Sequence, residues 1–513
     1  MRRPPLRLTD LLENLVDLPR DTAATDIHGL TIHGLTIHGL TVNSAAVSKG
    51  DLFFALPGSR HDGRDFIDDA VARGAGAIVT DDRPFKRQSA IAIPVLQAPN
   101  PRQVMAAAAA RFWPQQSGMI AAVTGTNGKT STVEFMRQIW ARVNWSAASI
   151  GTIGIRGTDT HDTHAPRSNI PQLTTPDSIS LHATVAAIAK QGVTHLALEA
   201  SSHGLQQYRL DGLNIHVAGF TNLSRDHLDH HCDMDDYFAA KARLFDKVLS
   251  EGGSAVINID DAYGKKLVSR IKHRPVVVKT FGTSKDADFH IKQISTTNVG
   301  LDLQLVYQGK TWHIPLALAG TFQAMNALTA AIMCHMSGLP LHDSLGSLAY
   351  LTSVPGRMQM VHGHPEKAQI IVDYAHTPDA LAAALAALRP AATGKLVVLF
   401  GCGGDRDTGK RAEMGHIAST GADQVFVTDD NPRTEDAASI RAAIIAACPA
   451  AIEIASRDKA IAAALASVGS GDVLLIAGKG HETVQLVGNE SLPFDDAAIA
   501  SHLMVQMQKE AVQ

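Results

Sequence analysis

Short aliphatic and β-branched runs alternate with longer alanine-rich stretches along most of this chain. Apolar runs of about four to eight residues are typical of strands buried on both faces, and the alanine-rich stretches have the composition of helices. This alternation predicts parallel sheets covered by helices, so the expected fold class is α/β. The strand-like runs include residues 119–123, 194–198, 217–220, 369–372, 396–400 and 473–476.

The length of the chain predicts more than one such sheet. Its 513 residues correspond to about three domains of ordinary size. We place an N-terminal domain at residues 1–112, a central domain at 113–351 and a C-terminal domain at 352–513.

A repeat lies inside the first of these regions. Residues 26–41 hold three copies of Ile-His-Gly-Leu-Thr, and a period of five residues matches neither a strand nor a helix. We interpret the repeat as an expansion in a loop or edge region rather than as a histidine metal site.

The composition is that of an ordinary soluble protein. Apolar residues make up 45% of the chain, charged residues 19%, and the net charge is −4, which argues against a nucleic-acid binder. The cysteines form no Cys-x-x-Cys pair, so neither a disulfide framework nor a zinc ribbon is indicated. No apolar run reaches the length of a signal peptide or a membrane span. We expect a cytoplasmic monomer with no membrane insertion.

A glycine-rich turn with a lysine follows the apolar run at residues 119–123 and predicts a phosphate-binding loop. Backbone N–H groups of residues 125–128 can face phosphate oxygens, Lys129 can neutralise the β/γ charge, and Thr130 can place its hydroxyl on Mg²⁺. The spacing is a shortened variant of the common P-loop, because Val123 stands where the first glycine usually does. The candidate nucleotide-binding residues here are Gly125, Thr126, Asn127, Gly128, Lys129, Thr130 and Ser131.

Polar clusters follow two further strand-like runs. Glu199 and His203 come after residues 194–198, and Asn222 and His227 come after residues 217–220. Ligands of open parallel sheets bind beyond the carboxyl ends of the strands, so these clusters predict a metal site near the phosphates. Residues 227–233, rich in His and Asp, can alternatively be read as the metal centre of a hydrolase.

The order of the motifs resembles the Mur ligase family, ATP-dependent enzymes that add amino acids during peptidoglycan synthesis. The matching segments are TGTNGKTS (124–131), EASSHGLQQYR (199–209), FTNLSRDHLDHH (220–231), YFAAK (237–241), VPGRM (354–358), VDYAHTPDAL (372–381), FGCGGDRDTGKR (400–411), TDDNPR (428–433) and GKGHE (478–482). The resemblance implies a UDP-binding N-terminal domain, a central P-loop-type ATPase domain and a C-terminal Rossmann-like domain. It also implies ATP and Mg²⁺ as cofactors and an acyl phosphate intermediate.

The resemblance assigns the catalytic and nucleotide-binding roles residue by residue. Lys129, Glu199 and His227 match catalytic positions, and Thr130, Glu199 and His227 match metal positions. Lys241 matches a lysine that is carbamylated in the family and helps to organise Mg²⁺, although its sequence context alone favours a solvated surface lysine. The adenine and ribose side is assigned to Asn326, Arg357, Asp373 and His376. Gln323 departs from the family, which usually has Asn at this position.

For the acceptor substrate, the resemblance implies UDP-N-acetylmuramoyl-L-alanyl-D-glutamate. The positions that match its binding site are Val42, Ser44, Thr174, Thr175, Ser201, Gln207 and Arg209. The chain has Asn43 and Ala45 where the family commonly has Asp and Arg, and residues 59–61 also differ from the family near the uracil.

For the incoming amino acid, the Asp-Asn-Pro-Arg motif implies meso-2,6-diaminopimelate. This substrate carries a second amino acid head, so a selective site needs a cation for the extra carboxylate and an acceptor for the extra ammonium group. The residues expected to form the site are Arg406, Asp430, Asn431, Pro432, Arg433, Gly478 and Glu482.

Other functions remain open from the sequence. A folylpolyglutamate synthetase or another Mur ligase shares the phosphate loop but is expected to lack the DNPR and GKGHE motifs. A P-loop nucleotide switch would turn over nucleotide without an amino acid, and a metal-dependent phosphohydrolase would depend on His227 more than on Lys129.

Overall fold

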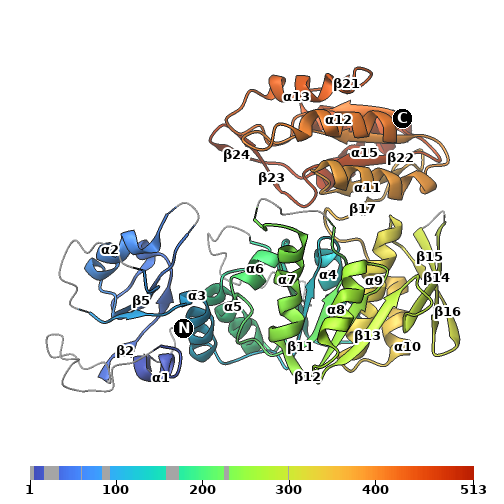
Figure 1. The fold of residues 1–513 in the computed structure, drawn as a ribbon. Helices are drawn as coiled ribbons and strands as arrows, with labels where there is room; N and C mark the ends of the chain where they lie inside the picture. Colours follow the sequence, from blue (N-terminus) through green and yellow to red (C-terminus); the bar gives the residue numbers. More distant parts are fainter. Residues whose placement is uncertain are drawn as a thin grey trace. The chain divides into compact units, whose positions relative to one another are not determined.

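The computed structural model describes residues 5–16, 34–58, 61–83, 93–157, 173–224, 230–297 and 300–512 (Figure 1). Their contacts divide them between two compact units. The first unit holds Met1–Asn127, Asn144–Ala255 and Tyr263–Val278, and the second holds Gly128–Val143, Val256–Ala262 and Lys279–Gln513. The predicted α/β class with parallel sheets is confirmed. The domain borders after residues 112 and 351 stay a prediction.

The first unit begins with a small parallel sheet of order β3-β4-β5-β6. All four residues of β4 and of β5 are buried, as expected for strands covered on both faces. The third repeat copy contributes to β2 and to the edge strand β3, while the first copy lies outside the described residues. The elements are β1 (Leu6–Arg7), α1 (Leu8–Leu12), β2 (Thr36–Ile37), β3 (Leu40–Thr41), β4 (Leu52–Ala55), α2 (Ile67–Ala72), β5 (Ala77–Thr80), β6 (Val95–Gln97) and α3 (Pro101–Phe112).

The same unit contains the strands that lead to the predicted phosphate loop. Their order is β11-β7-β10-β8-β9, and β7 pairs in parallel with both β10 and β11. The carboxyl ends of these three strands therefore lie at one edge of the sheet. The elements are β7 (Met119–Thr124), β8 (Ala147–Gly151), β9 (Gly154–Gly157), α5 (Ser178–Lys190), β10 (His195–Glu199), α6 (Ser202–Gln206), β11 (Ile215–Phe220), α7 (Met234–Arg243) and α8 (Ala262–Ile271).

In the second unit, helix α4 (Lys129–Arg142) packs against α9 (Thr321–Met336). The Trp140 indole nitrogen donates a hydrogen bond to the Ser337 hydroxyl at 3.0 Å, which helps to fix this packing. Strands β14 (Phe289–Thr297), β15 (Gly300–Tyr307) and β16 (Lys310–Leu316) form an antiparallel ladder. Strands β12 (Leu249–Asn258) and β13 (Val277–Gly282) lie where the chain passes between the units, and α10 spans Leu341–Gly346.

The rest of the second unit is a sheet of order β17-β18-β22-β19-β20-β21, parallel except for β17. Helices α11 to α13 pack on one face and α14 and α15 on the other, so the sheet is covered on both faces (Figure 1). The elements are β17 (Gln359–Val361), β18 (Gln369–Asp373), α11 (Pro378–Leu388), β19 (Leu396–Phe400), α12 (Lys410–Gly421), β20 (Gln424–Val427), α13 (Ala437–Ile445), β21 (Ile452–Glu453), α14 (Arg457–Ala466), β22 (Val473–Ala477), β23 (Val484–Val487), β24 (Glu490–Pro493) and α15 (Asp496–Val512). Within the described ranges, no helix combines the length and the apolar character needed to cross a membrane.

Candidate active site

The predicted phosphate loop connects the end of β7 at Thr124 to the start of α4 at Lys129. Gly125 and Gly128 have φ angles of +147° and +87°, in the region that favours glycine. A Cβ atom on Gly125 would lie 1.9 Å from the Thr221 hydroxyl, and one on Gly128 would lie 2.2 Å from Oδ1 of Asn326. Both glycines are therefore required by the backbone conformation and by the lack of space.

Asn222 organises this loop from the end of the neighbouring strand β11. Its backbone carbonyl accepts a hydrogen bond from the Thr126 N–H at 2.9 Å, and its side-chain oxygen accepts one from the Asn127 N–H at 3.0 Å. Two of the N–H groups expected to face phosphate are thus engaged with Asn222. Phosphate binding by the loop would then depend more on Gly128 and on the N-terminus of α4.

Lys241 lies in the last turn of α7 and is only 1% exposed. Its side-chain nitrogen donates a hydrogen bond to the Gly125 carbonyl at 2.8 Å and lies 4.4 Å from the centre of the Tyr237 ring. The Tyr237 hydroxyl is in turn 3.2 Å from that of Thr126. The prediction from the local sequence that Lys241 lies on the surface is therefore wrong. The residue is buried and contacts the phosphate loop directly.

Glu199 ends β10 and is 2% exposed. Thr152, just after β8, donates hydrogen bonds to both carboxylate oxygens, from its N–H at 2.8 Å and from its hydroxyl at 3.1 Å. Within the described part of the chain, Glu199 has no cationic side chain as a partner. A buried carboxylate without an opposite charge is costly, so this position suits a bound cation.

His227 lies outside the residues that the structure describes, so its predicted metal role stays a prediction. The neighbours invoked for a hydrolase centre have separate surroundings: His230 is exposed, His231 is buried beside Tyr237, and Asp233 caps α7. Across the described ranges, no group of three or more His, Cys, Asp or Glu side chains is arranged to hold a metal ion.

A second cluster joins residues predicted to bind the acceptor substrate. The Thr175 hydroxyl donates to the Glu199 carbonyl at 2.8 Å and accepts from the Ser201 N–H at 3.0 Å. Arg209 donates to the Thr175 carbonyl at 2.5 Å and to the Gln207 side chain at 2.8 Å. Thr174 lies beside them, with its hydroxyl 3.1 Å from that of Thr152.

The remaining acceptor-site candidates follow strand β3. Val42 is exposed, whereas Ser44 is buried in a short 3₁₀ helix that Asn43 caps through the Ala45 N–H. Ser44 also hydrogen-bonds to the Asp69 carboxylate, which contributes most to the lowering of the pKa of Asp69. The structure therefore gives these two residues surroundings separate from the cluster around Thr175.

Within the second unit, Gln323 links two of the residues that are predicted to bind the adenine and ribose of the nucleotide. Its side-chain nitrogen donates to the Arg357 carbonyl at 2.9 Å, and its oxygen accepts from the Asn326 amide at 2.9 Å. The longer side chain that replaces the family's Asn thus has a defined role between α9 and the turn at Arg357. The Arg357 guanidinium lies 4.9 Å from the centre of the Tyr374 ring.

Asp373 is the last residue of strand β18, and His376 lies in the turn that follows. Asp373 accepts hydrogen bonds from the N–H groups of Met358 at 2.8 Å and Ala375 at 2.9 Å. Burial raises the pKa of Asp373, although nearby Arg357 opposes the effect. The His376 ring contacts the Tyr374 carbonyl at 2.7 Å, so both residues are fixed by the turn after β18.

The DNPR and GKGHE segments meet through Lys479, which is fully buried. Its ammonium donates to Oδ1 of Asn431 at 3.1 Å, to Oε2 of Glu482 at 3.2 Å and to the Val484 carbonyl at 2.7 Å. The Asn431 amide also donates to Glu482 at 2.8 Å. Two residues predicted to bind diaminopimelate are therefore held by one buried cation.

The other members of this predicted site differ in exposure. Asp430 is buried against Gly478, and burial raises the pKa of Asp430 although Arg457 and Lys479 oppose it. Arg433 follows Pro432 with a φ of +51°, an uncommon conformation for a residue with a side chain, and donates to the Gly404 carbonyl at 2.8 Å. Arg406 is exposed and makes no side-chain hydrogen bond to the described residues.

Family models match most of the chain. The Mur ligase family catalytic domain matches residues 36–113, the Mur ligase middle domain residues 123–334, and the Mur ligase glutamate ligase domain residues 356–480. The chain belongs to the Mur ligase family.

Two relatives and one solved structure carry the same name. The chain is 47% identical over 508 residues to UDP-N-acetylmuramoyl-L-alanyl-D-glutamate--2,6-diaminopimelate ligase of Bradyrhizobium diazoefficiens, covering 97% of this chain and 100% of the relative. The protein of that name from Brucella melitensis is 44% identical, over 91% of this chain and 94% of the relative. A solved structure with the same name is 33% identical, with a TM-score of 0.68 over 94% of this chain and 99% of that chain. MurF ligase from Thermotoga maritima, solved with ADP, shares the fold at 19% identity, with a TM-score of 0.57 over 92% of this chain and 97% of that chain.

Two residues that shape these sites, Lys479 and Thr152, were not singled out by the sequence prediction. Lys479 lies inside the GKGHE motif, so the motif itself was an available signal. Asn222 was named in the polar cluster after residues 217–220, but its hydrogen bonds to the phosphate loop were not predicted. Thr152 had none, because its link to Glu199 depends on the parallel pairing of β8 and β10.

Proposed function

We propose that this chain is an ATP-dependent ligase that joins meso-2,6-diaminopimelate to UDP-N-acetylmuramoyl-L-alanyl-D-glutamate. The names of relatives that align over almost the whole chain support the reaction. The choice of amino acid is supported by one observation: the buried Lys479 holds Asn431 of the DNPR motif and Glu482 of the GKGHE motif. We further propose that the enzyme acts as a cytoplasmic monomer.

Joining a carboxylate to an amine requires a better leaving group than hydroxide. A carboxylate oxygen of the acceptor attacks the γ-phosphorus of ATP, the bond to the bridging oxygen breaks, and ADP leaves. The amine of diaminopimelate then attacks the acyl carbon, loses a proton and expels phosphate. Lys129 would neutralise phosphate oxygens in the first step, and Gly128 with the N-terminus of α4 would bind them.

The family also implies Mg²⁺, which when bound neutralises the charge on the transferring phosphate. The buried Glu199 carboxylate fits such an ion, because Thr152 orients both of its oxygens and no described side chain neutralises it. Thr130 would add a hydroxyl oxygen and His227 an imidazole. Lys241 would contribute oxygen ligands only after it becomes a carbamate, since an ammonium group cannot coordinate a cation.

Substrate recognition is divided among the remaining candidates. Asn326, Arg357, Asp373 and His376 would bind the adenine and ribose of ATP. Val42 and Ser44 would contact the nucleotide end of the acceptor, and the cluster of Thr174, Thr175, Ser201, Gln207 and Arg209 the rest of it. Arg433 and Arg406 would bind the distal carboxylate of diaminopimelate, while Asp430 and Glu482 would accept from its distal ammonium group.

Mass spectrometry of the product tests the reaction. The protein is incubated with the UDP-linked dipeptide, diaminopimelate, Mg²⁺ and ATP, and in a parallel sample with ADP in place of ATP. We expect a product heavier than the acceptor by one diaminopimelate less one water, formed only with ATP. Unchanged acceptor under both conditions would refute the proposal.

A further inference from the structure

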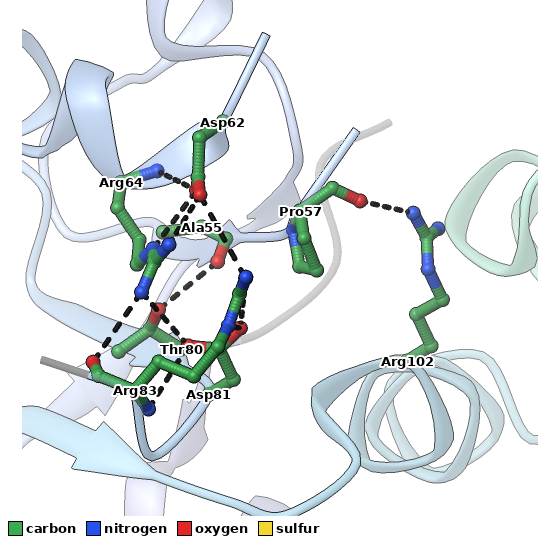
Figure 2. A network of polar contacts seen from close by, with 8 residues as sticks. All are labelled: Ala55, Pro57, Asp62, Arg64, Thr80, Asp81, Arg83 and Arg102. Carbon is green, nitrogen blue, oxygen red and sulfur yellow. Dashed lines mark hydrogen bonds and ion pairs between the residues drawn. The ribbon is translucent and has the colours of Figure 1, made fainter. Parts of the chain in front are cut away.

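Two arginines of the first unit converge on one neutral side chain. Arg102, in the first turn of α3, donates to Oε1 of Gln207 at 3.5 Å, and Arg209 donates to the same oxygen at 2.8 Å. Arg102 also donates to the Pro57 carbonyl at 2.7 Å, as Figure 2 shows. The two guanidinium groups therefore approach each other with only an amide oxygen as their shared acceptor.

Neither arginine has a carboxylate partner in the described part of the chain. Their acceptors are the Pro57 and Thr175 carbonyls and the Gln207 amide, all of which are neutral. Arg64 and Arg83 differ from them in this respect, because both of these arginines form ion pairs with the carboxylates of Asp62 and Asp81 (Figure 2). A partly buried guanidinium pair without a counter-charge is unfavourable until an anion arrives.

The groups around the pair do not supply this charge. The Nε2 atom of His203 lies 2.6 Å from the side-chain nitrogen of Gln207. Burial and the positive charge of Arg209 lower the pKa of His203, so its ring is neutral near pH 7. The Asp177 carboxylate favours the charge of Arg209, but its oxygens accept hydrogen bonds from the Ser180 N–H at 3.0 Å and from the Ser180 hydroxyl at 2.7 Å. Burial lowers the pKa of Arg102 and of Arg209, as expected for cations that lack a counter-ion.

The position of Arg102 indicates which anion would bind. Pro57 follows β4, whose neighbour β3 leads directly into Val42 and Ser44, the residues proposed for the nucleotide end of the acceptor. Gln207, Arg209 and Thr175 belong to the cluster proposed for the rest of that substrate. In a nucleotide sugar, the diphosphate lies between the nucleoside and the sugar. Guanidinium groups bind phosphate oxygens through two parallel hydrogen bonds, so the pair suits this middle group.

We propose that Arg102, together with Arg209, binds the diphosphate of the nucleotide-sugar substrate. This inference rests on the proposed function and adds to it a residue outside the motifs that define the family. Because Arg102 contacts both Pro57 and Gln207, bound diphosphate would also connect the two groups of acceptor-site residues.

Binding measured by titration calorimetry, without ATP or amino acid, tests the inference. The variants are Arg102→Met and Arg102→Lys. The control is Arg7→Met, which removes an exposed guanidinium paired with Asp10 in the same unit. We expect Arg102→Met to weaken UDP binding about tenfold or more and to leave uridine binding unchanged. Arg102→Lys should lose less affinity than Arg102→Met, and Arg7→Met should match the unaltered protein.

The outcomes separate this inference from the proposed function. Equal UDP affinity in Arg102→Met and the unaltered protein would overturn the role of Arg102 and leave the ligase proposal intact. Weaker binding of the full acceptor with unchanged UDP binding would place the arginine at a carboxylate instead and would also overturn it. No UDP binding by the unaltered protein would contradict the proposed substrate, and this inference with it. Thermal melting of each variant confirms that the affinities refer to folded protein.

Discussion

The side-chain nitrogen of Lys241 donates a hydrogen bond to the carbonyl of Gly125 at 2.8 Å, which ties the last turn of α7 to the first glycine of the phosphate loop. The two residues are 116 positions apart in the sequence. Tyr237, one turn earlier in α7, contacts Thr126 of the same loop. Lys241 therefore contacts the loop proposed to bind the phosphates of the nucleotide. A lysine on the protein surface would make no such contact.

Replacement of Lys241 by Arg tests whether the residue acts as a carbamate. Arginine keeps a positive charge and hydrogen-bond donors for Gly125, but it cannot take up CO₂ to form the proposed carbamate. We expect kcat to fall about a hundredfold or more, because the carbamate oxygens proposed to hold Mg²⁺ are lost, and with them the neutralisation of charge on the transferring phosphate. Phosphate release measures the rate, and Lys247→Arg, at an exposed lysine shortly after α7, is the control. Near-normal activity in Lys241→Arg would restrict Lys241 to a structural role.

Arg433 is expected to bind the distal carboxylate of diaminopimelate. Arg433→Ala should raise KM for diaminopimelate about tenfold or more, since a charge-assisted contact contributes roughly 1.5–3 kcal/mol. KM for ATP should stay the same. Arg389→Ala removes an exposed guanidinium of the same unit and serves as the control. If KM and selectivity against lysine are unchanged in Arg433→Ala, Arg433 has no role in specificity.

Lys479 is expected to act as a positioning residue for Asn431 and Glu482. Lys479→Met keeps much of the side-chain volume but leaves Asn431, Glu482 and Val484 without the donor they share. We expect KM for diaminopimelate to rise about tenfold, and unfolding to become easier by about 1–3 kcal/mol, while KM for ATP is unchanged. Lys459→Met, on the exposed face of α14, provides the comparison. Equal changes in the KM values for ATP and diaminopimelate would indicate general damage instead.

His481 should make stability depend on pH below neutrality. Burial and the nearby Arg357 lower the pKa of His481 from 6.5 to about 4. Between these values the unfolded chain binds a proton that the folded protein does not, so stability is retained above pH 6.5 and falls as the pH drops toward 4. The full effect is at most about 3–4 kcal/mol. Denaturant unfolding of the unaltered protein and His481→Gln measures it. Parallel curves across this pH range would contradict the prediction.

The sequence predicted the fold well where the signal was local. The apolar runs at residues 369–372, 396–400 and 473–476 correspond to β18, β19 and β22, because each is a continuous buried strand of a parallel sheet. The glycine-rich turn likewise lies between β7 and α4 as expected. Such features depend on neighbouring residues, so their pattern is visible without the rest of the chain.

Features that depend on contacts between distant parts of the sequence were harder to predict. The sequence around Lys241 is that of an ordinary helix, and only the contacts with Gly125 and the Tyr237 ring show that the lysine is buried. Arg102 looks like an ordinary residue of a helix first turn until its guanidinium is seen to reach Pro57 and Gln207. Sequence motifs therefore indicate the reaction more readily than they indicate which buried charges support it.

Phosphate release from ATP tests the central claim most directly. The UDP-linked dipeptide is present throughout, and the samples contain meso-diaminopimelate, L-lysine or no amino acid. We predict release with diaminopimelate and little or none in the other two samples, because the acyl phosphate is consumed only when the correct amine is bound. Release with lysine instead would contradict the assigned amino acid. Equal release in all three samples would contradict the ligase and favour a nucleotide switch or a hydrolase.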